Sequence, residues 1–472
     1  MAEPTLGQVL AEFAVTSYRH GVPAEVRTSV RQRVLDTVGI AVAASGLDTS
    51  RAVLGYVTEQ GGRPQAHAVG VPTLLPAPLA ALANGTLAHS LDYDDTHLPS
   101  VLHPSASVVP AGLAAAEMAG ASGADLVAAV AVGLEICVRL GMGGYDRDAG
   151  NSMFFERGQH ATSICGAIGG AATAALLTGA DAAGVLHAMG LAVSMSGGVI
   201  EANRTGGTVK RLHCGWAAHA AVTAAALAAR GFTGPPTVFE GRFGFYRAWL
   251  DGRFDEPAVR AGLGTDWEVP GIFFKPYPAN HFTHTAADAA FALRDRGVRL
   301  EDVTSIRLGV ADPTVRTIGE PIEVKRAPAT GYAAQFSGPY VVVAAFLGGG
   351  GLGLGLDDFT DEKATDPVRR EHMAKVEVRS DPDCTAVFPN QFPAVLTVVT
   401  ADGRELTERV MANRGGPARP LDDAELARKF TDNAGRRLDP HAVESIRTAI
   451  ETLDQQPTVG PCLAPAGIPE EE

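Results

Sequence analysis

Apolar residues recur at three- and four-residue spacing through the first 267 residues, and Gly- or Pro-containing breaks separate the segments. This is the period of a helix with a buried face. The pattern predicts helices over 24–44, 75–92, 105–120, 124–141, 159–178, 181–197 and 212–230. These segments are rich in Ala and Gly, whose small side chains let helix backbones pack closely. We therefore expect an all-helical domain here.

The pattern changes after residue 268, where alternating, β-branched runs appear among shorter helical ones. We predict strands over 303–310, 374–381, 394–403 and 404–411, with helices over 283–297, 331–347 and 361–371. The Ala-Asp-Gly between the last two strands is typical of a hairpin turn. Strands and helices mixed in this way predict an α+β domain.

Two further helical patterns, over 421–434 and 439–454, have the period of the first region. We therefore predict a mainly α fold, with a large all-helical domain formed by residues 1–267 and 412–456. A smaller α+β domain would span 268–411. The tail, 457–472, is rich in Pro and acidic residues, and we expect it to be disordered.

Composition narrows the class of protein. Hydrophobic residues make up 46% and charged residues 19% of the 472, which excludes an intrinsically disordered chain. A net charge of −14 argues against a nucleic-acid partner. We find no uninterrupted apolar run long enough for a membrane span, no signal peptide and no Cys-x-x-Cys pair. These features predict a cytoplasmic protein that binds neither membrane nor nucleic acid.

Four segments carry candidate chemistry, and the first is residues 84–110. It places Asp92, Thr96, His97 and His103 close together in the chain, and prolines make the end of the segment a loop. Asp and His could bind a metal, but the segment has neither a His-Glu-x-x-His nor an EF-hand spacing. An acidic turn with incidental histidines is the structural alternative.

The second and third segments place basic groups at expected helix starts. His160 opens a helix of small residues, where the helix dipole favours a neutral imidazole that can accept a proton. Lys210 follows the Gly-rich stretch 196–207, and a lysine beside backbone N–H groups suits a carboxylate. The alternatives are a buried structural histidine and a solvated lysine.

The fourth segment, 273–290, lies at the expected domain boundary. Lys275 stands between Phe and Pro, followed by Asn280 and by His281 and His284, which are three residues apart on one helix face. Clefts between domains are favoured ligand sites. The alternative is a linker lysine that points to solvent.

Together the segments supply imidazoles, carboxylates and lysines without a metal-ligand set or a cofactor fingerprint. This inventory favours proton transfer beside a substrate carboxylate, with histidine moving the proton and ammonium groups holding the negative charge. We therefore expect catalysis that needs no metal and no cofactor. A non-catalytic binding protein stays open as an alternative.

Several motifs resemble the MmgE/PrpD family, which includes 2-methylcitrate dehydratase, cis-aconitate decarboxylase and iminodisuccinate epimerase. The resemblance runs in order over roughly residues 5–450 and is carried by NGTLAHSLDYDDTH, HPSASVVP, GQHATSICGAIGGAATAA, GTVKRLHCGWAAHAA and FKPYPANHFTH. It implies a large helical domain, an α+β lid domain, a homodimer and an active site between the domains. These motifs identify the superfamily but do not separate its members.

The resemblance also implies residue roles. It makes His103 and His160 the proton-transfer pair, Asp92 a group that orients an imidazole, and Lys210 and Lys275 the groups that bind substrate carboxylates. It places further substrate contacts at Thr96, His97, Asn280, His284 and Tyr340. Trp216 and Asn280 depart from the residues common in relatives and are expected to alter the pocket wall.

The implied function is a lyase acting on a small di- or tricarboxylate, by dehydration of a 2-methylcitrate-like substrate or decarboxylation of a cis-aconitate-like one. The nearest alternative is an epimerase or isomerase, in which one histidine removes a proton and the other returns it to the opposite face.

Overall fold

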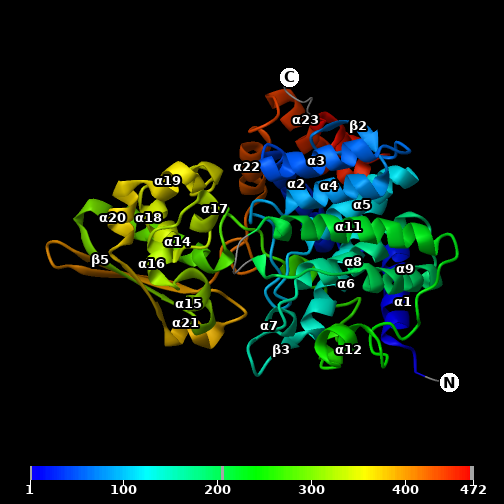
Figure 1. The fold of residues 1–472 in the computed structure, drawn as a ribbon, viewed down its shortest axis with the longest axis horizontal. Helices are drawn as coiled ribbons and strands as arrows, with labels where there is room; N and C mark the ends of the chain where they lie inside the picture. Colours follow the sequence, from blue (N-terminus) through cyan, green and yellow to red (C-terminus); the bar gives the residue numbers. More distant parts are fainter. Residues whose placement is uncertain (1–2, 203–206, 468–472) are drawn as a thin grey trace. The chain divides into compact units, whose positions relative to one another are not determined.

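The computed structural model describes residues 3–202 and 207–467. Its chain forms two compact units, one of residues 1–272 and 430–472 and one of residues 273–429. Helices dominate and the sheets are small, which confirms the expected fold class. Figure 1 shows the elements with the labels used below.

The first unit is a stack of helices around a core of small side chains. Its longer helices are α1 (Leu6–His20), α2 (Ala24–Ala44), α3 (Asp48–Gln60), α4 (Ala77–Ala88), α5 (Ser105–Ala119), α6 (Gly123–Gly143), α8 (Ala161–Leu177), α9 (Ala182–Met195), α11 (Val209–Ala228) and α23 (Pro440–Glu451). Shorter ones are α7 (Met153–Glu156), α12 (Phe245–Leu250) and α13 (Glu256–Arg260). The predicted helix over 24–44 has the bounds of α2.

Helix α8 lies at the centre of this unit, where it packs against α5, α6, α9 and α11, and all of its residues are buried. Glycines make the approach to α6 close. A Cβ atom at Gly169 would lie 2.3 Å from the carbonyl oxygen of Gly133, so neither helix has room for a side chain there. The small-residue composition of these segments therefore fixes how closely the helices pack.

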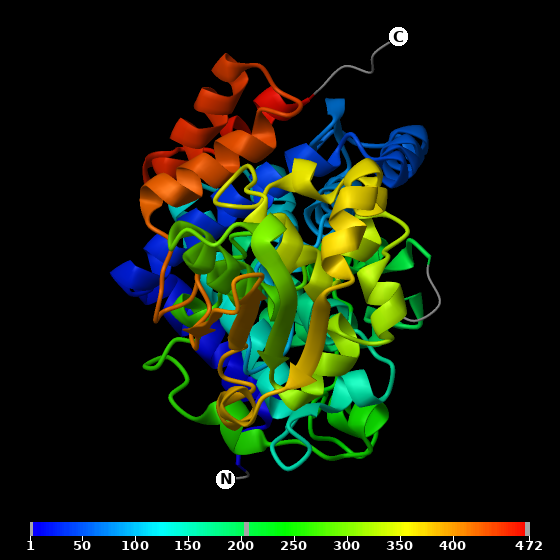
Figure 2. The ribbon, with the colours of Figure 1, turned by 90° about the vertical axis from the view of Figure 1, so that its left-hand side faces the viewer.

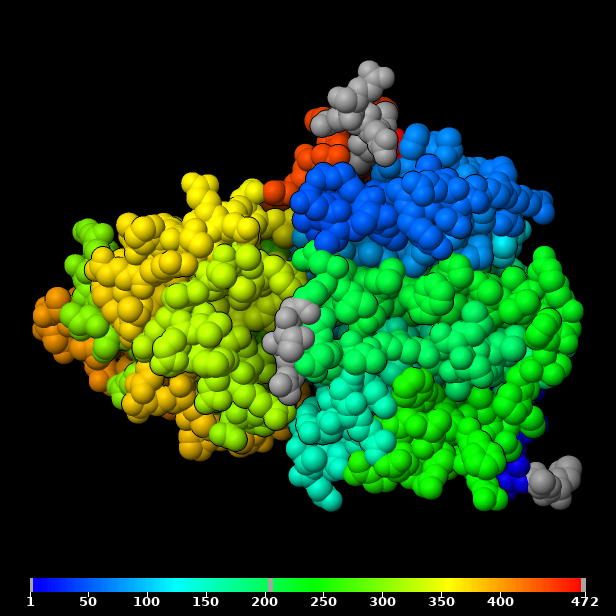
Figure 3. All heavy atoms as spheres, in the orientation of Figure 1, coloured from blue at the N-terminus to red at the C-terminus, as the bar shows by residue number. Residues whose placement is uncertain are grey.

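The surface of the unit joins segments that are distant in sequence. Arg211 on α11 donates a hydrogen bond of 2.9 Å to the Thr49 hydroxyl on α3, and Figure 3 shows these green and blue parts side by side. By length and composition α6 could cross a membrane, but 89% of its apolar window is buried. That burial is typical of the core helix of a soluble protein.

The expectation of an all-helical first domain needs a small correction. Two antiparallel pairs are present, β1 (Ala66–Ala68) with β2 (Val71–Leu75), and β3 (Tyr145–Asp146) with β4 (Asn151–Ser152). Strands this short span too few residues to show a period of two, and Pro72 breaks the pattern of the longest one.

The second unit is a four-stranded sheet with helices. The strands β5 (Val303–Val310), β6 (Val376–Ser380), β7 (Ala394–Thr400) and β8 (Glu405–Val410) are arranged in the order β6-β5-β7-β8. Figure 2 faces this sheet. Only the β5–β6 pair is parallel, and β7–β8 is the expected hairpin. The helices are α14 (His284–Asp295), α15 (Asp312–Ile318), α16 (Ile322–Arg326), α17 (Gly331–Ala334), α18 (Gly338–Phe346), α19 (Asp361–Thr365), α20 (Pro367–Met373) and α21 (Pro382–Val387).

Two helices predicted as continuous are each divided. The one over 331–347 becomes α17 and α18, because Ser337 caps a new helix and accepts a hydrogen bond from the backbone N–H of Tyr340. The one over 361–371 becomes α19 and α20, because Asp366 caps a helix that begins at Pro367.

The edges of the units also differ from the expected 267/268 and 411/412. The chain after β8 stays with the second unit, since the N–H of Phe274 donates to the carbonyl of Gly415 and Arg419 pairs with Asp288. Helix α22 (Asp423–Ala434) then contains the boundary after Lys429.

The prediction of a disordered tail over 457–472 is wrong for residues 457–467, which are ordered in the structure. Buried apolar side chains of residues 459–466 and two short 3₁₀ turns, Gly460–Cys462 and Ala464–Ala466, hold this part against the first unit. Residues 468–472 lie outside the described residues.

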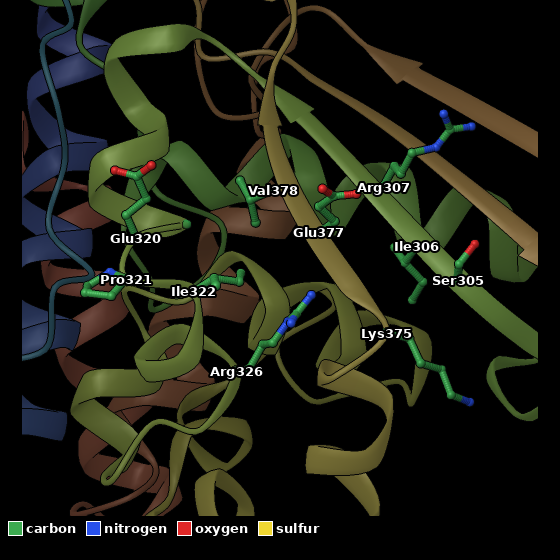
Figure 4. Close-up of a pocket in the computed structure, with 11 residues that line it drawn as sticks. Ser305, Ile306, Arg307, Glu320, Pro321, Ile322, Arg326, Lys375, Glu377 and Val378 are labelled. Atoms are coloured by element: carbon green, nitrogen blue, oxygen red, sulfur yellow. The ribbon is translucent and has the colours of Figure 1, made fainter.

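A groove of about 860 Å³ lies along the outer edge of β6 (Figure 4). The N–H of Ile306 donates to the carbonyl of Lys375, so the next carbonyl, that of Val376, faces away from β5. Arg326 on α16 reaches that carbonyl and donates two hydrogen bonds of 2.9 and 2.6 Å. Among the described residues, none of the sequence-predicted site residues lines this groove.

Candidate active site

The loop between α4 and α5 carries the first group of predicted residues, and a buried ion pair anchors it. Asp95 lies 3.0 Å from Arg33 on α2, and both side chains are almost fully buried. The Asp95 carboxylate also accepts hydrogen bonds from the backbone N–H and hydroxyl of Ser105. Asp92 has a φ of 50°, a left-handed conformation that costs energy in a non-glycine residue and needs such support.

His103 ends this loop, and its contacts fix the tautomer of its ring. Its Nδ1 lies 2.6 Å from the backbone carbonyl of Asp95 and 3.2 Å from the Thr96 hydroxyl. A carbonyl only accepts, so Nδ1 carries the proton and a neutral His103 presents Nε2 as its basic atom. The backbone N–H of His103 donates to the Thr162 hydroxyl on α8.

His160 is the N-cap residue of α8, as the sequence predicted, and it contacts a second histidine. Its Nδ1 lies 3.0 Å from the Nδ1 of His213 on α11. Two nitrogens at this distance share a single proton, so the tautomers of the rings are linked. Gly198, with a φ of 147°, makes the approach possible, because a Cβ there would lie 3.1 Å from the His160 Cβ and 3.5 Å from the His213 Nδ1.

His89, at the end of α4, connects these two sites. Its ring centroid lies 5.4 Å from that of His160 and 5.6 Å from that of His103. Its Nδ1 is 2.6 Å from the Asp94 carboxylate. His89, His103, His160 and His213 thus form one group, which we call the histidine cluster. Its members come from the end of α4, the loop before α5, the start of α8 and helix α11.

Lys210 lies at the rim of the histidine cluster. Its ammonium group is 3.5 Å from the carboxylate of Asp92, and its side chain is 14% exposed. Asp92 forms an ion pair with Lys210, while the carboxylate on the His89 ring is that of Asp94, so the predicted role of Asp92 in orienting an imidazole stays a prediction. Asp92 stands two residues nearer the end of α4, and its left-handed backbone turns it toward α11.

Electrostatics divides the cluster into charged and neutral rings. Burial opposes the charged form of His89, but the Cys214 sulfur and the Asp94 carboxylate outweigh it and raise the pKa of His89 to about 10. Burial and the neighbouring His89 and Lys210 hold the pKa of His160 well below its usual range. Burial, His89 and Lys210 also lower the pKa of His213 to about 4. Near pH 7 His89 is therefore an imidazolium beside the neutral rings of His160 and His213.

His97 is fully buried in the same loop but contacts other groups. Its Nδ1 is 2.8 Å from the Ser100 hydroxyl, and its Nε2 is 3.3 Å from the carboxylate of Glu268. These contacts hold the loop against the segment before residue 272. They give no support to the predicted substrate contact of His97.

The remaining predicted residues belong to the second unit. Lys275 is 1% exposed, and the Asn280 side chain accepts a hydrogen bond from the N–H of Phe282 at the start of a short 3₁₀ turn. His284 is fully buried, with its Nε2 3.1 Å from the carbonyl of Ala279. The predicted roles of these residues stay predictions.

Tyr340 is the weakest of the predicted contacts. It is 0% exposed in the core of the second unit, and its hydroxyl donates to the Asp358 carbonyl and lies 3.4 Å from Arg369. A fully buried hydroxyl with these partners holds α18 in place, and these contacts give no support to a substrate contact of Tyr340.

Sequence reasoning did not assign roles to His89, Asp94 or His213. One local signal was available for His213, because Lys210 and His213 are three residues apart and share a face of α11. No spacing links His89 with His160, which are brought together by helix packing alone. Within the ranges 3–202 and 207–467, no group of three or more His, Cys, Asp or Glu side chains could hold a metal ion.

Trp216, which differs from the residue common in relatives, is not a member of the histidine cluster. Its side chain is 48% exposed and stacks on His219 of the same helix, with ring centroids 5.1 Å apart. Part of the preceding Gly-rich stretch, residues 203–206, lies outside the described residues.

Comparisons with known proteins match both parts of the chain. A family model described as the MmgE/PrpD N-terminal domain matches residues 8–257, and one described as the MmgE/PrpD C-terminal domain matches 277–455. The mouse cis-aconitate decarboxylase is 29% identical over 91% of this chain and 86% of its own length. The human cis-aconitate decarboxylase is 29% identical over 90% and 86%, and the Aspergillus terreus one is 24% identical over 94% and 92%.

Proposed function

The chain belongs to the MmgE/PrpD family and is a lyase of the decarboxylase or dehydratase type, and from this premise we propose that it decarboxylates a small unsaturated tricarboxylate of the cis-aconitate type. The observation that carries the proposal is the histidine cluster, with the Lys210–Asp92 pair at its rim. The names of the aligned relatives favour decarboxylation over dehydration.

Lys210 supplies the positive charge that attracts substrate. It is partly exposed beside Asp92, so a substrate carboxylate can replace part of that ion pair. The contact of the Thr96 hydroxyl with His103 supports the proposal that Thr96 binds a second polar group of the substrate. The proposed contribution of Lys275 to carboxylate binding rests on the family resemblance.

Proton transfer then completes the reaction. The bond between a carboxylate carbon and its neighbouring carbon breaks, CO₂ leaves, and the electron pair spreads over the alkene onto an adjacent carboxylate. One histidine N–H, of His103 or His160, delivers a proton to carbon, so each turnover consumes one proton and releases one CO₂. The ring that has given up its proton is protonated again from solvent, and the partly exposed His103 is the route for this proton.

The experiment is a direct assay of the purified protein. It is incubated with cis-aconitate, citrate, 2-methylcitrate and iminodisuccinate in turn, and substrate and product are followed by NMR with CO₂ measured in parallel. We expect CO₂ to be released from cis-aconitate in step with its loss. Consumption of none of the four compounds would contradict the proposal and favour a non-catalytic binding protein.

Heavy water separates the alternatives on the same fold. Decarboxylation in D₂O places one deuterium in the product and releases CO₂. An epimerase instead returns deuterated substrate without CO₂ or a new alkene, and a dehydratase forms an alkene without CO₂. Either of these last outcomes would replace the decarboxylase proposal while keeping proton transfer by the cluster.

A further inference from the structure

The Asp94–His89 pair is a buried charge pair that the proposed reaction leaves unused. The His89 side chain is fully buried and the Asp94 side chain is 4% exposed, and the His89 Nδ1 lies 2.6 Å from the Asp94 carboxylate. A hydrogen bond of this length between imidazole and carboxylate favours the charged forms of both. An imidazolium is thus fixed within 6 Å of the ring centroids of both His103 and His160.

The neighbouring titratable groups that shift the pKa of His160 are all bases among the described residues. His89 faces it from the end of α4, His103 from the loop before α5, and Lys210 and His213 from α11. Burial and each of these groups lower the pKa of His160. Among them His89 combines a fixed charge with a centroid distance of 5.4 Å, so its removal should have the largest effect.

We propose that Asp94 and His89 are positioning residues whose buried ion pair keeps His160 uncharged, and therefore able to take up and return a proton during turnover. His213 contributes through the proton that its Nδ1 shares with the Nδ1 of His160. Because that contact occupies the Nδ1 of His160, the Nε2 is the ring atom that would exchange a proton during turnover. This inference rests on the proposed function of His160 as a proton-transfer group. Neither Asp94 nor His89 needs to touch the substrate.

Two variants test the pair. Asp94→Asn removes the carboxylate that, together with the Cys214 sulfur on α11, favours the charged form of His89. His89→Gln removes the positive ring but keeps an N–H donor for Asp94. In both, we expect the pKa of His160 to rise by about one pH unit or more, toward the ordinary histidine value. The second variant keeps the test decisive if the first does not fold.

The measurement uses histidine labelled with ¹⁵N in the whole protein. The His160 ring signal, assigned by its absence in His160→Gln, is titrated without substrate. The limb of the kcat/KM pH profile that reports His160 should move to higher pH together with the pKa of His160. Glu135→Gln is the matched control, because it removes a buried carboxylate that pairs with Arg139.

The outcomes separate the two proposals. If His160 titrates unchanged in both variants, or shifts equally in Glu135→Gln, the positioning role is wrong. If His160 shifts as expected but the wild-type protein consumes no carboxylate substrate, the ion pair acts as proposed and the proposed function fails.

Discussion

The Arg33–Asp95 ion pair should be a main support of the loop that carries the active-site residues. The Arg33 guanidinium lies 3.0 Å from Asp95 and donates to the carbonyls of Val269 and Ile272, at 3.3 and 2.6 Å. Burial raises the pKa of Asp95 and lowers that of Arg33, so each charge depends on the other. Arg33→Met keeps the length of the side chain and removes all of these interactions.

The expected cost follows from what the substitution leaves behind. A buried carboxylate without its counter-ion costs about 3–5 kcal/mol. The loss of the Arg33 donor to the Ile272 carbonyl adds roughly 1 kcal/mol, whereas the Val269 carbonyl keeps the Ser29 hydroxyl and the Ile272 N–H as donors. We expect a loss of about 5 kcal/mol, a large share of the ~5–15 kcal/mol that stabilises a typical domain. Because the backbone of Asp95 also holds His103, kcat/KM should fall as well.

The assay is urea unfolding followed by far-UV circular dichroism, with activity measured beside it. Arg31→Met is the matched control, since it removes the same charge from the same helix at a half-exposed pair with Asp454 and should cost about 1 kcal/mol or less. The double variant Arg33→Met with Asp95→Asn removes both charges of this pair, so much of the loss should be recovered. Equal destabilisation of the single and double variants would refute this account.

Three further predictions concern the site, the core and pH. His103→Ala and Lys210→Ala should each lower turnover about 100-fold or more with an unchanged circular dichroism spectrum, and near-normal turnover in both would remove their roles. Gly169→Ala should destabilise by about 1–3 kcal/mol in urea unfolding, because its Cβ meets backbone at 2.3 Å. Gly55→Ala, which meets nothing within 4 Å in helix α3, should leave stability unchanged or raise it. Burial and nearby positive charges lower the pKa of His213 from 6.5 to about 4, so the folded protein binds fewer protons than the unfolded chain. Stability should therefore fall as the pH drops from 6.5 toward 4, and His213→Gln should show a shallower fall; equal slopes would contradict this.

Much of the fold followed from local pattern. The 3.6-residue period located α2 to the residue, and alternation located the β7–β8 hairpin. Local pattern failed where an element was too short to show its period, as in β1, or where a cap interrupted a helix, as at Ser337. It also missed the edge of the second unit, because hydrogen bonds rather than composition keep the Gly415 turn there.

The candidate site could be predicted only in part, for a related reason. His103, His160 and Lys210 stand in segments whose prolines, glycines and helix starts mark them. Their partners His89 and His213 lie in sequence segments with an ordinary helical pattern. The contact between His160 and His213 joins residues 53 positions apart, and no local sequence spacing indicates it. Roles that depend on which side chain lies next to which therefore needed the three-dimensional arrangement.

The guanidinium of Arg326 has a consequence for how copies of this protein behave in concentrated solution. An edge strand with open carbonyls is a template on which a foreign strand can add, and repeated addition leads to fibrous aggregates. By occupying the outward carbonyl of Val376, Arg326 blocks the first rung of such a ladder and brings a positive charge to the exposed rim. Arg326 thus protects the β6 edge against strand addition between molecules.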